Sequence, residues 1–209
     1  MINIKVCGIT AVKQLHQLEG LNIPFAGLIF AKESPRYVGD KLKPEELDGL
    51  DLDIKLTGIF VNAEFAEISD TAEKYGLDVI QLHGDEDPDL CADLTEEYEV
   101  MKAFRVGVNT TSIDEKIKAY DEACDYYLFD TVSEGVSGGT GKKFDWKKIT
   151  YSKIEKPFFL SGGIGPADAA VIKKFRHPDF YGVDINSLFE KEPGVKDMAL
   201  VLKFMRDLK

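Results

Sequence analysis

The chain has 209 residues, enough for one well-buried domain, and its 44% hydrophobic and 30% charged residues are typical of a soluble globular protein. Its net charge of -11 disfavours nucleic acid and anionic membranes as partners, because both attract basic surfaces. No apolar stretch approaches the roughly 20 residues of a membrane helix, and the N-terminus lacks a signal-peptide core. The three cysteines, Cys7, Cys91 and Cys124, show no metal-type spacing and no disulfide framework, so we expect a cytoplasmic protein.

Short, nearly continuous apolar runs recur along the whole chain. Runs of this kind are typical of parallel strands that are covered by helices on both faces. We predict eight strands, at Ile2–Val6, Phe25–Phe30, Lys55–Val61, Asp78–Leu82, Val100–Phe104, Tyr126–Phe129, Pro157–Leu160 and Phe180–Ile185.

Helical patterns lie between these runs. Two helices are predicted from their N-caps, one with Leu15 and Leu18 after Thr10 and one with a capping box of Ser112 and Glu115. Two more are predicted from apolar residues spaced three or four apart, namely Phe65, Ile68, Ala72 and Tyr75, and Val195, Met198, Leu202 and Met205. Weaker candidates lie at Pro44–Leu50 and Trp146–Lys153. Eight strand–helix units average about 26 residues, near the shortest span of a βαβ crossover. We therefore predict one (β/α)8 TIM barrel of parallel strands over residues 1–209, in preference to an open doubly wound sheet.

In such barrels the chemistry lies where the strands end. Cys7 ends the first run and precedes Gly8, which leaves room beside the thiol. A lone cysteine is more often a small buried hydrophobic residue, but an exposed thiolate here could act as a base or nucleophile. Asp130 ends the sixth run, where it is either an N-cap, a salt-bridge partner or a general acid or base. The pair predicts two catalytic groups around one mouth.

Other polar side chains follow the remaining strands. Arg36 is either a solvated arginine or a clamp for a carboxylate or phosphate. Gln81 and His83 share one strand face, so both can contact a substrate, although a buried histidine is an equally good interpretation. Arg105 is read as part of a buried ion pair rather than as a second cationic contact. Gly139 lies in a glycine-rich loop that resembles a phosphate loop in composition but not in spacing, and such a loop can also close over a substrate.

The last two strands are followed by backbone suited to an anion. Gly162 and Gly163 allow close approach to the backbone before Pro166 starts a helix. After the eighth strand come Asp184, Asn186 and Ser187, and Ser187 with Glu190 reads as a capping box for a short extra helix. Barrels commonly bind phosphate at these two strand ends. The sequence therefore predicts a phosphorylated small-molecule substrate, held by local dipoles in spite of the acidic net charge.

Together these motifs resemble those of the phosphoribosylanthranilate isomerase family, the barrel enzymes of the tryptophan pathway. The matching stretches, in family order, are Lys5-Val6-Cys7-Gly8-Ile9-Thr10, Ser34-Pro35-Arg36-Tyr37, Gln81-Leu82-His83-Gly84, Leu128-Phe129-Asp130-Thr131, Gly138-Gly139-Thr140-Gly141 through Phe144-Asp145-Trp146, Ser161-Gly162-Gly163-Ile164 and Pro193-Gly194-Val195-Lys196-Asp197. One stretch departs from the family, because Leu188 stands where a small Ser-Ser-Gly stretch usually ends.

The resemblance implies a reaction and a role for three residues. N-(5-phosphoribosyl)anthranilate would undergo an Amadori rearrangement, with Asp130 as general acid, Cys7 as general base and Arg36 at the anthranilate carboxylate. It requires no metal or organic cofactor, because the iminium intermediate is its own electron sink. Acid and base must start in opposite protonation states, so we expect a thiolate-favouring environment for Cys7 and one that raises the carboxyl pKa of Asp130.

Three rival functions remain. A ribulose-phosphate epimerase would need metal-binding histidines inside the barrel, and a lyase like the tryptophan synthase α subunit would need a pair of carboxylates and no thiol. A non-catalytic phosphosugar-binding barrel is the third rival, and the presence of both Cys7 and Asp130 argues against it. The sequence leaves open whether the protein is a monomer or a homodimer.

Overall fold

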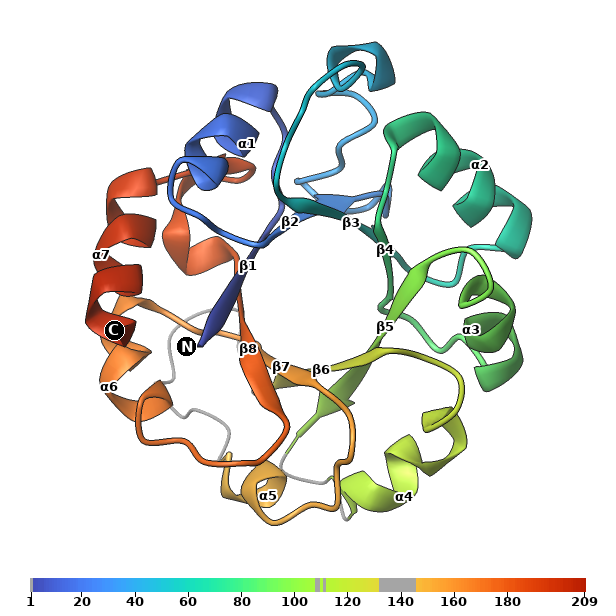
Figure 1. Ribbon diagram of the computed structural model, residues 1–209, viewed down its shortest axis with the longest axis vertical. Coiled ribbons are helices and arrows are strands. Elements are labelled where there is room, and N and C mark those ends of the chain that lie inside the picture. The colour runs from blue at the N-terminus through green and yellow to red at the C-terminus, as the bar shows by residue number, and fades with distance from the viewer. Residues whose placement is uncertain (1, 108–109, 111, 132–145) are drawn as a thin grey trace.

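All eight predicted strands are present in the computed structural model, which describes residues 2–107, 110, 112–131 and 146–209. They are β1 (Asn3–Cys7), β2 (Phe25–Ile29), β3 (Lys55–Phe60), β4 (Val79–Leu82), β5 (Glu99–Val106), β6 (Tyr126–Thr131), β7 (Phe158–Ser161) and β8 (Phe180–Ile185). Each strand pairs in parallel with its neighbour in the chain, and β8 pairs with β1 to close the barrel (Figure 1). The predicted (β/α)8 barrel is confirmed.

Helices surround the barrel (Figure 1). They are α1 (Val12–Glu19), α2 (Phe65–Tyr75), α3 (Pro88–Leu94), α4 (Ile113–Ile117), α5 (Lys147–Thr150), α6 (Ala169–Ile172) and α7 (Met198–Leu208), with the 3-10 turns η1 (Pro44–Glu46), η2 (Lys118–Tyr120), η3 (Pro166–Asp168) and η4 (Ser187–Phe189). A short hairpin of β9 (Glu190–Glu192) and β10 (Val195–Lys196) follows β8. The sequence patterns missed α3 and this hairpin.

Of the predicted starts of α1, α4 and α7, that of α4 is right and the other two are wrong. Thr10 does not cap α1, because its hydroxyl instead donates to the carbonyl of Gly194 at 2.7 Å, which ties the exit of β1 to the distant hairpin. Val195 belongs to β10 rather than to the last helix, whose buried residues are Val201, Phe204 and Leu208. Ser112 does cap α4, where its hydroxyl accepts the N–H of Glu115.

The barrel interior is filled from the N-terminal end by aromatic and aliphatic side chains. The rings of Phe25 on β2 and Phe159 on β7 lie 5.4 Å apart, although these strands are not neighbours, so their contact spans the interior. Met101 and Leu128 pack into the same cluster. The interior of the barrel is therefore a packed core, as expected for eight strands.

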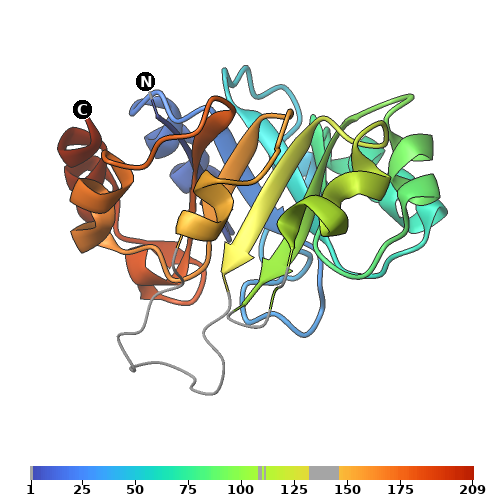
Figure 2. The same ribbon diagram turned by 90° about the horizontal axis from the view of Figure 1, so that it is seen from below.

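A buried polar layer lies between this apolar floor and the mouth. Its members are Lys5, Thr57, Gln81, Ser161 and Asp184, each no more than 8% exposed. Figure 2 shows both chain termini at one end of the barrel and the loop between β2 and β3 at the other. Among the described residues no helix combines the length and apolar character needed to span a lipid bilayer.

Candidate active site

A cavity of about 230 Å³ opens at the C-terminal ends of the strands. Nine of the eleven predicted site residues line it, namely Cys7, Gln81, His83, Asp130, Gly162, Gly163, Asp184, Asn186 and Ser187. Ile29 and Ile59 form an apolar wall between β1 and β4. Arg36 lies outside this lining, and Gly139 lies outside the residues that the structure describes.

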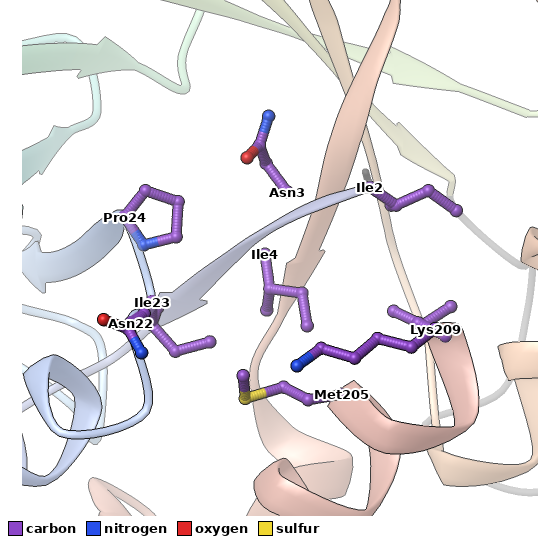
Figure 3. Close-up of a pocket in the computed structure, with 9 residues that line it drawn as sticks. Ile2, Asn3, Ile4, Asn22, Ile23, Pro24, Met205 and Lys209 are labelled. Atoms are coloured by element: carbon purple, nitrogen blue, oxygen red, sulfur yellow. The ribbon is translucent and has the colours of Figure 1, made fainter.

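A larger hollow of about 430 Å³ lies at the opposite end of the barrel, between the start of β1, the turn before β2 and the end of α7 (Figure 3). Ile4 and Met205 are among the mostly apolar side chains that line it, with Lys209 at its edge (Figure 3). It collects no group of converging polar side chains. The smaller cavity is therefore the better candidate for chemistry.

Cys7 forms one wall of the cavity but is only 5% exposed, so the alternative of an exposed thiolate is wrong and the thiol is buried, as a lone cysteine more often is. Burial raises the pKa of Cys7, while the ammonium groups of Lys5 and Lys196 partly oppose that effect. The expectation of a thiolate-favouring environment is thus also wrong, since the surroundings as a whole favour the neutral thiol. The turn after Cys7 is fixed by the Gly27 carbonyl, which accepts both the Gly8 and the Ile9 N–H at 2.9 Å.

Lys5 and Asp184 form an ion pair just below the cavity. Lys5 Nζ lies 2.8 Å from Asp184 Oδ1, and the Ser161 hydroxyl donates to Asp184 Oδ2 at 2.9 Å. Burial lowers the pKa of Lys5, but the Asp184 carboxylate and the Cys7 side chain together more than compensate, so that pKa is raised overall. Asp184 faces the cavity with both oxygens already engaged. The ammonium group also contacts Cys7, which shares its face of β1.

Gln81, His83 and Asp130 form a second polar chain. Gln81 Nε2 lies 2.8 Å from His83 Nδ1, and His83 Nε2 lies 3.2 Å from Asp130 Oδ2. Gln81 is 1% exposed, whereas the side chains of His83 and Asp130 are 23% and 28% exposed. Asp130 is therefore not fully buried, and it faces the cavity with a histidine as its partner.

Arg36 is held by a carboxylate of the protein itself. Its Nε and Nη2 atoms donate to Glu190 at distances from 2.6 to 3.0 Å, and Lys196 Nζ donates to Glu190 Oε1 at 2.7 Å. Burial raises the pKa of Glu190, but the hydrogen bonds from Arg36 and Lys196 lower it to about 2. Lys196 also donates to Asn186 Oδ1 at 2.7 Å, which joins the cavity wall to this ion cluster.

Gly8 is the contact point between Cys7 and the cluster. Its φ of +77° favours glycine, and a Cβ atom there would lie 2.7 Å from Arg36 Cδ and 2.9 Å from Asn186 Oδ1. Any side chain at this position would push the cluster away from the cavity. Gly8, which the sequence analysis expected to leave room beside the Cys7 thiol, therefore makes room for the side chain of Arg36.

The backbone after β7 and β8 forms the remaining wall. Gly162 and Gly163 have φ values of +90° and +64°, conformations that few other residues adopt. The predicted capping box at Ser187 is wrong, because η4 has no side-chain cap and Glu190 binds Arg36 and Lys196 instead. The predicted buried ion pair at Arg105 is also wrong, since that side chain is exposed.

Comparison with known proteins identifies the family. The model of the N-(5'-phosphoribosyl)anthranilate isomerase family matches residues 4–207. The chain belongs to this family. It is 42% identical over 208 residues to the N-(5'-phosphoribosyl)anthranilate isomerase of Parabacteroides distasonis, covering 98% of this chain and 92% of that protein. A relative in Phocaeicola vulgatus is 35% identical over 209 residues, 99% of this chain and 97% of that protein.

Solved structures of phosphoribosylanthranilate isomerases share the fold. The enzyme of Thermotoga maritima superposes with a TM-score of 0.84 at 30% identity, covering 100% of this chain and 98% of that one. Another isomerase structure, with a TM-score of 0.79 at 28% identity and the same coverage, is a complex with reduced 1-(o-carboxyphenylamino)-1-deoxyribulose 5-phosphate. A further Thermotoga maritima structure, at 28% identity and a TM-score of 0.80 with the same coverage, contains monomers generated from a dimeric isomerase.

The departure at Leu188 from the isomerase family pattern is accommodated without strain. Among the described residues the only non-glycine positions with positive φ are Asn22 and Asn62, so Leu188 occupies an ordinary backbone conformation. Its side chain is 51% exposed and lies near Gly165 at the rim of the site. A branched side chain is therefore compatible with this loop of the isomerase barrel.

Three residues of the site were not predicted from the isomerase sequence, namely Lys5, Glu190 and Lys196. All three side chains are at most 4% exposed and lie next to predicted residues. Lys5 carried a signal, because a lysine inside an apolar strand pattern needs a buried partner. Glu190 and Lys196 lie in stretches that the sequence analysis singled out, but neither was assigned to the site, because their shared partner Arg36 lies 154 residues away from Glu190.

Proposed function

We propose that the chain catalyses the Amadori rearrangement of N-(5-phosphoribosyl)anthranilate to 1-(2-carboxyphenylamino)-1-deoxy-D-ribulose 5-phosphate, a step of tryptophan biosynthesis. The observation that carries this proposal is that Cys7 and Asp130, on strands three steps apart around the ring, line one cavity. Membership of an isomerase family supports it. A substrate that lies across the mouth would then meet one group on each side.

The proposed reaction needs one acid and one base. Asp130 protonates the furanose ring oxygen, the bond from C1 to that oxygen breaks, and an iminium ion forms between C1 and the anthranilate nitrogen. The Cys7 thiolate removes the proton on C2, and the electrons of that C–H bond form the enolamine, which tautomerises to the ketone. Burial makes the thiolate rare but strongly basic, and Lys5 and Lys196 offset part of the cost of its formation.

Substrate binding follows from the same walls. We expect the phosphate at the backbone amides of Gly162, Gly163 and Ser187, where glycine allows close approach. Asn186 and Asp184 lie beside that position. Arg36 is expected to meet the anthranilate carboxylate, although Glu190 already engages its Nε and Nη2 atoms, which leaves Nη1 for the substrate.

The proposal is tested by generating phosphoribosylanthranilate in situ and following the decay of its anthranilate-type fluorescence. The wild type should accelerate the decay well above buffer, and Cys7→Ser and Asp130→Asn should each reduce kcat by at least about 10²-fold. Cys124→Ser and Asp93→Asn are matched controls, because Cys124 is buried outside the cavity and Asp93 is exposed on α3.

Two results would contradict the proposal. If the wild type shows no decay above buffer, a non-catalytic phosphosugar-binding barrel becomes the better description. If Cys7→Ser or Asp130→Asn keeps a near-normal rate, that residue loses its assigned role. Circular dichroism of each variant separates a catalytic loss from a folding defect.

A further inference from the structure

The hydrogen-bonded chain from Gln81 through His83 to Asp130 crosses one strand of the barrel. Gln81 and His83 extend from β4 and Asp130 from β6, while β5 between them presents the small side chain of Ala103 to the interior. The short side chain leaves the space that the imidazole bridges. Both ring nitrogens of His83 therefore have a partner, so the partner of one nitrogen decides which nitrogen carries the proton.

The orientation of the Gln81 amide fixes that choice. Its nitrogen is only a donor, so Nε2–H donates to Nδ1 and the neutral imidazole carries its proton on Nε2. The reverse orientation would put the amide NH2 group where Oε1 now lies, a buried position in which Oε1 has no partner among the described residues. A buried donor without a partner is rarer than an unpaired carbonyl oxygen, so the observed orientation is favoured.

We propose that Gln81 and His83 are positioning residues that determine which oxygen of Asp130 carries the acid proton. This inference rests on the isomerase function proposed above. Because His83 Nε2–H donates to Oδ2, Oδ2 is the carbonyl oxygen of the neutral acid and the proton lies on Oδ1. The opposite tautomer would present a lone pair to Oδ2 and would draw the proton to that oxygen instead.

The same hydrogen bond acts during proton transfer. The Oδ1–H bond breaks, a new O–H bond forms at the furanose ring oxygen, and the electron pair of the bond to C1 moves onto that oxygen. The negative charge left on Asp130 then strengthens the hydrogen bond from His83 Nε2–H, because a bond to a charged acceptor is stronger than one to a neutral acceptor. His83 thus stabilises the conjugate base without touching the proton that is transferred.

The tautomer can be measured directly by long-range ¹H–¹⁵N NMR, since the chain has only three histidines. His177 is an internal reference, because Nδ1 accepts the Asp179 N–H at 3.1 Å and Nε2 donates to the Ser152 carbonyl at 3.1 Å. His16 is an exposed reference. At a pH of about 8, His83 should show the protonated-Nε2 pattern of His177. A proton on Nδ1 would overturn the proposal.

Substitution of Gln81 tests the link to catalysis. Gln81→Glu places a carboxylate oxygen against Nδ1 and forces a proton onto that nitrogen, with almost no change in size. We expect the ¹⁵N pattern of His83 to change and kcat to fall by about 10²-fold with KM within about twofold, the size of effect expected for a lost acid-step interaction. Gln17→Glu on the exposed face of α1 is the matched control for the added charge.

Two substitutions of His83 distinguish the effect of its hydrogen-bond donor from the effect of the space that its side chain fills. His83→Gln retains an N–H near the position of Nε2, whereas His83→Met fills the space without a donor. The first variant should keep at least about tenfold more kcat than the second. Equal rates in the two variants, or a normal kcat in Gln81→Glu, would overturn the positioning role while the wild type still turns over. Failure of the wild type itself would instead reject the proposed function, and this role with it.

Discussion

Lys5 Nζ and Asp184 Oδ1 lie 2.8 Å apart in a side-chain environment that is almost closed to water, with 0% and 5% of the two side chains exposed. The pair lies directly below Cys7 and joins β1 to β8, the seam at which the barrel closes. Isolated charges at such a depth are costly, so each member depends on the other. The ion pair of Lys5 and Asp184 therefore stabilises both the pairing of β1 with β8 and the surroundings of Cys7, the proposed base.

Removal of one member of this pair should be strongly destabilising. Lys5→Met leaves the Asp184 carboxylate buried without its counter-ion, and we expect a loss of about 3–5 kcal/mol in the free energy of unfolding. The double variant Lys5→Met/Asp184→Leu should lose clearly less, because no uncompensated charge remains. Denaturant-induced unfolding of the two variants measures the difference.

A surface pair provides the control for that experiment. Lys203 and Asp207 on α7 are 3.3 Å apart but 68% and 45% exposed, so Lys203→Met should change the unfolding free energy by no more than about 1 kcal/mol. A double variant as unstable as Lys5→Met alone would show that the pair matters through packing and not through charge.

The ion cluster around Glu190 predicts a pH dependence of stability. The pKa of Glu190 is lowered from its ordinary 4.5 to about 2, so its contribution is fully present above pH 4.5 and is lost as the pH falls through about 2. A shift of this size corresponds to about 3 kcal/mol. The wild type should lose this stability between those pH values, and Glu190→Gln should show a flatter profile there.

Unfolding free energies measured across this pH range test the assignment. Glu192→Gln changes an exposed carboxylate two residues along the same strand and should leave the acid profile of the wild type unchanged. If Glu190→Gln retains the full acid dependence, other carboxylates are responsible for it.

The strands and the mouth of the site were predictable because both depend on local patterns. Continuous apolar runs mark strands buried on two faces, and barrel geometry then brings strand ends such as Cys7 and Asp130 together whatever their separation in sequence. The sequence analysis missed α3 although its start carries a signal, because Asp87 caps the helix and Pro88 occupies its first turn.

The partners of these residues were not predictable in the same way. Lys5 and Asp184 are 179 residues apart, and the match depends on the register between β1 and β8. Glu190 was read as a capping residue because its spacing from Ser187 fits a capping box, yet two cations in the folded chain compete for the same carboxylate. Long-range charge pairing overrode a weak local signal.

The exposed Leu188 should be replaceable. Because its backbone conformation is ordinary and its side chain is 51% exposed, Leu188→Gly should change the unfolding free energy by about 0.5 to 1 kcal/mol at most. The substitution leaves unchanged the amides of Gly162, Gly163 and Ser187 at the proposed phosphate position, so KM for the phosphorylated substrate should stay within about twofold, equivalent to less than about 0.5 kcal/mol. A much larger rise in KM in steady-state assays would show that the leucine side chain itself shapes the phosphate site.

The Cys7 thiol should react slowly and in a strongly pH-dependent way. Burial raises its pKa above the ordinary 9.0, so the thiolate fraction and the rate of alkylation by iodoacetamide should rise about tenfold per unit from pH 7 to 9. Lys196→Met should slow the reaction further, because the Lys196 ammonium lowers the pKa of Cys7. Mass spectrometry of the native protein after timed alkylation locates the modified cysteine.

Cys91 and Cys124 serve as internal controls in the same sample. Burial raises the pKa of both thiols to about 12, and neither lines the cavity, so both should remain unmodified while the fold is intact. A rate at Cys7 that is already constant above pH 7 would mean that the thiolate predominates there, and the proposed balance between burial and the two lysines would then be wrong.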